Sequence, residues 1–154
     1  MSLRVATSGT DADFIVKVID VYPSDTPPNP DLPAGANPGG VSLAGFQQLV
    51  KGDVFRARWR DGYETPKPMV PGEPAKIDYQ LQDVFHTFKK GHRLMVQVQS
   101  SWFPLIDRNP QTFVPNINRA SEKDFKAATM TVLRSKTQAS KLSLPVLPSQ
   151  PVVP

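Results

Sequence analysis

Alternating apolar and polar positions mark a strand most clearly over residues 93–101. Leu94, Val96 and Val98 lie there on one face, and Arg93, Gln97 and Gln99 lie on the other. A period of two is typical of a strand that buries one face and wets the other. A glycine-bearing turn precedes this run, and Pro104 ends it because proline cannot donate to a ladder. The pattern predicts a strand whose apolar face, Leu94, Val96 and Val98, lies in the core.

Residues 14–22 form the second strong signal. The run FIVKVIDVY is apolar on both faces and rich in β-branched side chains, which predicts a central strand covered on both sides. Residues 75–81 alternate strictly. Shorter strands are expected over 3–7, 46–50, 54–60, 129–133 and 141–144, with a turn at Gly52-Asp53.

Only one helix is predicted. Ser121-Glu122-Lys123-Asp124 resembles a capping box and favours a short helix over about 122–128. Prolines punctuate the rest of the chain, so residues 23–40 and 61–72 should be long surface loops and 145–154 a frayed tail. Together these elements predict an all-β, jelly-roll β-sandwich.

Charge and composition narrow the classes of partner. The 154 residues suit one domain, and 18 basic against 14 acidic residues give a net charge of +4. The basic residues are scattered, and we expect Arg56, Arg58 and Arg60 on a solvated sheet face, so nucleic acid is not an expected partner. No run of about 20 apolar residues suggests a membrane partner. Without cysteine, neither a disulfide nor a thiolate metal site can form.

Candidate catalytic groups are few. The sequence has no G-x-S-x-G pentapeptide, and its two histidines, His86 and His92, flank one turn. A structural role for both is favoured over a general base or a metal ligand. For Asp11 and Asp13 a turn is favoured over a cation-binding loop. No catalytic residue, metal site or cofactor is therefore predicted.

The aromatic residues that end the 93–101 strand leave two interpretations open. Trp102 and Phe103 could form a sugar platform, but core or domain-docking aromatics are favoured. The following Asp107-Arg108-Asn109-Pro110 could be a charged catalytic loop, although its chemistry favours a self-satisfied turn.

The same region carries a family resemblance. The chain closely resembles the C-terminal domain of the Xaa-Pro dipeptidyl-peptidase-like serine hydrolases over the runs 83–93, 95–104 and 107–111. Within these hydrolases it looks most like the α-amino-acid ester hydrolases and the glutaryl cephalosporanic acid acylases. Segments 7–14, 17–23, 48–56 and 142–147 match the same domain. The resemblance extends from about Val5 to Leu147.

The resemblance implies a jelly roll of the galactose-binding-like type over residues 1–147, followed by the tail 148–154. It also implies a partner, an α/β-hydrolase domain of the same parent chain that holds the Ser-Asp-His triad. No triad position matches a residue here, so no catalytic residue is carried over. The family's domain has further strands before the position of Val5. We therefore expect a domain without its first strands and a homo-oligomer formed through an exposed strand edge.

Two functions follow as expectations. The first is a non-catalytic accessory domain of a serine ester or amide hydrolase, bracing the catalytic domain and walling its substrate pocket. The alternative is a free-standing carbohydrate- or peptide-binding module. The resemblance suits a periplasmic or secreted bacterial parent but does not fix the compartment. For the first function the docking residues are predicted to be Trp102, Phe103, Asp107, Arg108 and Phe113.

Overall fold

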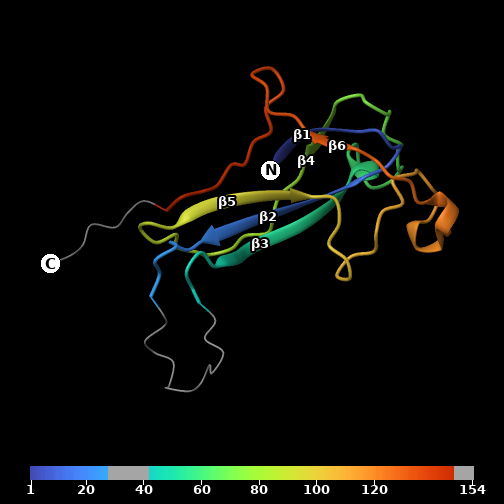
Figure 1. Cartoon of the computed structure of the whole chain (residues 1–154). Coiled ribbons are helices and arrows are strands. Elements are labelled where there is room, and N and C mark those ends of the chain that lie inside the picture. The colour runs from blue at the N-terminus through green and yellow to red at the C-terminus, as the bar shows by residue number, and fades with distance from the viewer. Residues whose placement is uncertain (28–41, 148–154) are drawn as a thin grey trace.

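Two antiparallel sheets of three strands face each other in the computed structural model, which describes residues 1–27 and 42–147 (Figure 1). The smaller sheet has the order β4-β1-β6 and the larger one β3-β2-β5. The predicted all-β sandwich is thus confirmed. The strands are β1 (Ser2–Thr7), β2 (Asp13–Val21), β3 (Gln47–Arg56), β4 (Ala75–Asp78), β5 (Arg93–Gln99) and β6 (Met130–Val132), with 3-10 turns at Ala57–Trp59, Ile117–Arg119 and Glu122–Asp124.

Strand β2 is the centre of the larger sheet, as its two apolar faces predicted. It pairs with β3 along one edge and with β5 along the other. Phe14, Ile15 and Val16 are at most 1% exposed. The core between the sheets joins side chains of both, since Leu3, Val5 and Ile77 pack with Phe14, Val16 and Phe55.

The apolar face of β5 is not buried as the alternation predicted. Leu94 remains 45% exposed and Val96 39%, while Val98 is partly buried against the core. The smaller sheet covers only one end of the larger sheet (Figure 1). The prediction was therefore correct for the strand and wrong for the burial of its first two apolar positions.

Strand β3 corrects the predicted turn at Gly52-Asp53. The strand runs straight through both residues and joins two segments that the sequence separated. A Cβ at position 52 would lie 2.6 Å from Cη2 of Trp102, so a larger residue there would displace the Trp102 ring. The strand expected over 54–60 ends at Arg56, and Ala57–Trp59 forms a 3-10 turn instead.

The predicted helix is also wrong. The capping box is present, since the Ser121 N–H and hydroxyl both donate to Asp124, at 2.8 and 2.7 Å. Only one 3-10 turn follows, because no residue of Glu122–Asp124 is buried and a short helix needs tertiary packing to persist. The strand expected over 141–144 is reduced to a single bridge between Ser2 and Lys141.

Two predictions fall on residues that the structure does not describe. Most of the proline-rich loop predicted over 23–40 lies within 28–41, and the frayed tail lies at 148–154. Both stay predictions.

Candidate docking surface

Both histidines bind one buried carboxylate. The carboxylate is that of Asp20, which lies on β2 and is 1% exposed. One of its oxygens is hydrogen-bonded to His86 Nε2 at 2.8 Å, and the other is hydrogen-bonded to His92 Nδ1 at 2.9 Å. The segment 79–92, which links β4 to β5, is thereby fastened to the sheet. This supports the structural role predicted for the two histidines.

Opposing effects act on the Asp20 carboxyl. Burial alone would raise its pKa, but the hydrogen bonds and positive charge of His86 and His92 together hold the pKa below its ordinary value. The pattern of the sequence placed Asp20 on a strand but gave no sign of this pairing. Only the antiparallel register of β2 and β5 brings position 20 beside His92.

A buried ion pair corrects the prediction that three arginines line a solvated face. Arg58, 4% exposed, donates through Nε and Nη2 to Asp11 Oδ2 at 2.9 and 2.5 Å. Its Nη1 donates to the Val114 carbonyl at 2.9 Å. Arg58 turns inward because β3 ends at Arg56, which breaks the alternation that would have kept it on the wet face.

The neighbouring acid, Asp13, holds the loop that carries the predicted docking residues. Its Oδ1 accepts the Asn109 side-chain N–H at 2.8 Å, and Arg56 lies 3.7 Å from its other oxygen. Burial raises the pKa of Asp13 to about 6, although Asn109 and Arg56 both act to lower it. Asp11 and Asp13 therefore have protein partners of their own.

The loop after β5 is anchored at several points. The Phe113 N–H donates to the Thr10 hydroxyl at 2.8 Å, and the Gln111 N–H donates to the Asn109 side chain at 2.8 Å. Together with the Asn109 and Val114 contacts, these bonds fix residues 109–114 against the start of β2. The Asp107-Arg108-Asn109-Pro110 run is irregular rather than the predicted self-satisfied turn, and its Asn109 side chain bonds to Asp13 and Gln111 outside the run.

The predicted docking residues divide into two groups. Trp102 and Phe113 are partly buried against their own domain. Lys17 Nζ lies 4.3 Å from the centroid of the Trp102 ring, and the Arg58 guanidinium lies 4.8 Å from the centroid of the Phe113 ring. Phe103 is 57% exposed and Leu105 69% exposed. Arg108 stacks 4.7 Å from the Phe103 centroid, and Asp107 is exposed beside it. We call Phe103, Leu105, Asp107 and Arg108 the 103–108 surface.

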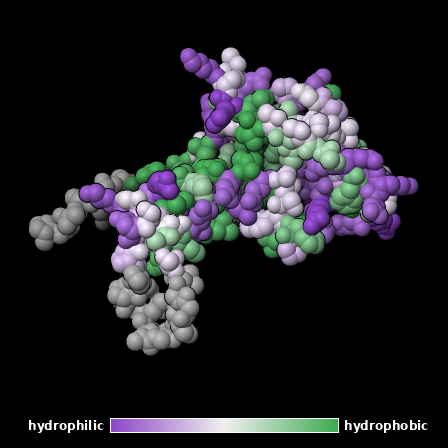
Figure 2. All heavy atoms as spheres, viewed as in Figure 1, coloured by the Kyte–Doolittle hydropathy of each residue, from purple (hydrophilic) through white to green (hydrophobic). Residues whose placement is uncertain are grey.

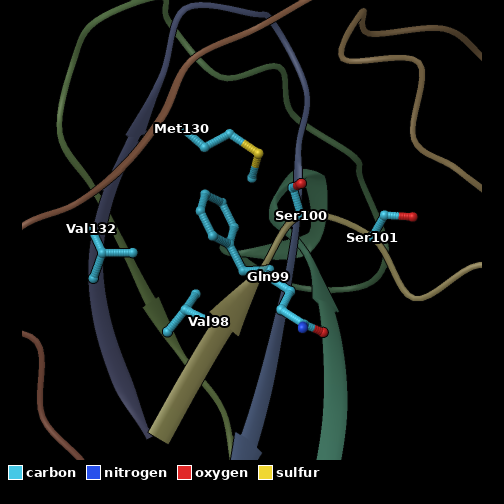
Figure 3. A pocket seen from close by; sticks show the side chains of 7 residues that line it. Val98, Gln99, Ser100, Ser101, Met130 and Val132 are labelled. Carbon is cyan, nitrogen blue, oxygen red and sulfur yellow. The ribbon is translucent and has the colours of Figure 1, made fainter.

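Two hollows open at the sides of the sandwich. One, of about 450 Å³, lies between β5 and β6 and is lined by Phe14, Val98, Met130 and Val132 among others (Figure 3). The other, of about 410 Å³, lies beside β3 and β4 and is lined in part by Trp59, Tyr63 and Asp53. Neither is lined by a histidine, so neither pairs a nucleophile with an imidazole base.

Metal-ligand clusters and membrane-spanning helices are both absent from the described part of the chain. Residues 1–27 and 42–147 contain no cluster of three or more histidine, aspartate or glutamate side chains arranged to hold a metal ion. Over the same residues no helix has the length and apolar character needed to cross a bilayer.

The fold and these contacts define a β-sandwich domain in which the buried charges of the described residues pair with groups of the same domain. The comparison with known families specifies the class further, because residues 1–143 match the X-Pro dipeptidyl-peptidase C-terminal non-catalytic domain. The chain belongs to this family.

Similar proteins are larger hydrolases. The cocaine esterase of Rhodococcus sp. (strain MB1 Bresler) is 30% identical over 145 residues, which cover 94% of this chain and 22% of the esterase. Among solved structures, an aminopeptidase from a marine sediment archaeon, Thaumarchaeota archaeon, has 47% identity and a TM-score of 0.78, with 89% of this chain and 21% of that one covered. An α-amino acid ester hydrolase has 44% identity and a TM-score of 0.77, covering 89% and 20%. The chain thus spans about a fifth of these relatives.

Proposed function

We propose that residues 1–147 brace the catalytic domain of a serine ester or amide hydrolase and wall part of its substrate pocket. The relatives include an esterase, an aminopeptidase and an ester hydrolase, and the family is described as non-catalytic. The partner is an α/β-hydrolase domain of the same parent chain. The 103–108 surface is its docking site.

The observation that carries this proposal is exposed apolar area on a rigidly held loop. Phe103 and Leu105 are largely exposed, yet the residues after them are held by the Asn109 bond to Asp13 of β2 and by the Phe113 bond to Thr10, which precedes β2. Apolar side chains held outward in this way favour an interdomain contact, because covering them gains roughly 25 cal/mol per Å² and the anchored loop has little further conformational entropy to lose.

A chimera tests the docking site. This chain replaces the matching fifth of the α-amino acid ester hydrolase, and Phe103→Asp is compared with Phe85→Asp, whose side chain is 94% exposed elsewhere on the domain. Phe103→Asp should lower kcat/KM about tenfold or more and lower the melting temperature, since a carboxylate would be buried at the contact. Phe85→Asp should leave both unchanged. Equal effects of the two substitutions would contradict docking through the 103–108 surface.

The carbohydrate- or peptide-binding module stays as the second candidate. It is favoured by the hollow beside β3 and β4, where Tyr63 is 75% exposed and its ring lies 6.3 Å from that of Trp59. Aromatic rings beside carboxylates are a common lining for such ligands. A chimera that is indifferent to Phe103→Asp would favour this candidate over the first.

A further inference from the structure

The two hollows of the sandwich differ in chemistry. The hollow between β5 and β6 is lined mostly by apolar side chains, and Figure 2 shows apolar surface over the neighbouring β5. The hollow beside β3 and β4 combines aromatic rings with charged side chains, since its lining includes Asp53, Trp59, Arg60, Tyr63, Asp78 and Tyr79. A volume of about 410 Å³ with a few polar groups among aromatic rings is typical of a site for a small ligand.

Three aromatic rings line the hollow beside β3 and β4. The rings of Trp59 and Tyr63 have centroids 6.3 Å apart and planes inclined at 36°. The Tyr79 ring is held in place because it stacks on Phe55, with a centroid distance of 5.2 Å. The face of such a ring attracts a cation, and the attraction is stronger where less water surrounds the cation.

The charges of the lining favour a cation over an anion. The Arg60 guanidinium is bound to its own domain, because Nη1 and Nη2 donate to three backbone carbonyls at 2.8–3.1 Å. Asp78 is paired with Lys76 at 2.5 Å. Asp53 is partly buried, and one of its oxygens accepts the Val54 N–H at 2.8 Å. It forms no ion pair within the described residues 1–27 and 42–147, which leaves its negative charge for a ligand.

We propose that the hollow beside β3 and β4 binds an organic cation, with an alkylammonium or guanidinium group beside Asp53 and against the rings of Trp59 and Tyr63. The inference rests on the second candidate function and gives it a ligand class. The amino terminus or a basic side chain of a peptide belongs to this class, and a neutral sugar does not. The cation comes either from a free ligand or from a lysine or arginine of the parent chain, which present the same chemistry to the hollow.

A titration with choline tests the site in the purified, isotope-labelled chain. The chain has two tryptophans, and only Trp59 lines the hollow. The indole N–H resonance of Trp59 should therefore shift and saturate, while that of Trp102 should not move. The alcohol 3,3-dimethylbutan-1-ol has the shape of choline without its charge and should bind about tenfold more weakly or less. No saturable shift of Trp59, or equal binding of the alcohol, would overturn the proposal.

Two variants with matched controls locate the bound cation. Asp53→Asn keeps the shape of the side chain and removes its charge, so choline binding should weaken about tenfold. Asp83→Asn, at an exposed acid elsewhere, should have no effect. Tyr63→Ala removes a ring that is 75% exposed, so the fold should be retained while binding weakens about threefold or more. Phe85→Ala, at a ring 94% exposed, is its control. A variant that binds choline like its control would contradict the proposed position.

Neutral ligands separate the failure of this inference from the failure of the second candidate function. A saturable shift of Trp59 with maltose or with N-acetylated, amidated tetra-alanine, but not with choline, would overturn the cation and retain the binding module. A response to none of the three would contradict both. In the chimera, calorimetry identifies the source of the cation. Choline binding that Asp53→Asn weakens would indicate a free ligand, whereas its loss on joining the catalytic domain would indicate a basic side chain of that domain.

Discussion

At the scale of single residues, two buried aspartates on β2 show how the hydrogen-bonding and charged partners of a carboxyl determine the direction of its pKa shift. Asp20 is bound by two histidines, and its pKa falls below the ordinary value despite burial. Asp13 has an amide and a more distant arginine, and burial raises its pKa to about 6. Sequence pattern identified both as acids near turns or strands, but neither partner set could be inferred. The hydrogen-bonding partners of the two carboxyls come from positions 66 to 96 residues away in the chain.

The raised pKa of Asp13 predicts a specific pH dependence. Between about 4 and 6 the folded state retains a proton on Asp13 that the unfolded state has lost, so this group lowers the free energy of unfolding as pH rises. Asp13→Asn removes that effect while its amide oxygen can still accept from Asn109. The free energy of unfolding of Asp13→Asn minus that of the wild type should therefore increase by on the order of 1–3 kcal/mol as the pH rises from about 4 to 6.

Urea midpoints measured from pH 4 to pH 7 check this prediction. Asp25→Asn, at an exposed aspartate, serves as the control and should give a flat difference. A flat or falling difference for Asp13→Asn would show that Asp13 ionises normally in the folded protein.

At the scale of elements, the strands could be predicted because periodicity and β-branched composition are local signals. The runs around 14–22 and 93–101 both became strands, and the first is central as expected. What failed depends on tertiary contacts. Burial of Leu94 and Val96 depends on how far the second sheet extends, and the inward turn of Arg58 depends on where β3 ends. The docking role of Trp102, Phe103, Asp107, Arg108 and Phe113 stays a prediction, and the sequence did not indicate which of them are exposed.

The 79–92 segment provides the prediction at this scale. It has little regular structure, so the Asp20 clamp should contribute much of its attachment to the sheet. Asp20→Ala should cost about 2–3 kcal/mol, because two charge-assisted hydrogen bonds are lost. Hydrogen exchange should quicken in residues 79–92 before it does in β1. Asp83→Ala changes the same charge at an exposed site and should cost little. Equal losses from the two variants would argue against the clamp.

At the scale of the whole molecule, the buried polar groups and the exposed apolar groups have separate roles. The ion pair of Asp11 with Arg58 and the Asp13–Asn109 bond stabilise the loops that shape one end of the sandwich. Among the exposed apolar residues, Phe103 and Leu105 lie on the 103–108 surface, and Leu94 and Val96 lie on β5. We propose a catalytic domain as the partner of the 103–108 surface. This contact requires no reactive side chain.

The central claim is that this domain contributes structure to a hydrolase and no chemistry of its own. The measurement that tests it most directly is the hydrolysis of p-nitrophenyl esters and amino-acid amides by the purified chain. We predict a rate equal to that of buffer, unchanged by a serine-directed phosphonate, because the chain has no nucleophile elbow and both of its histidines bind Asp20. Turnover above buffer that the phosphonate abolishes would contradict the claim.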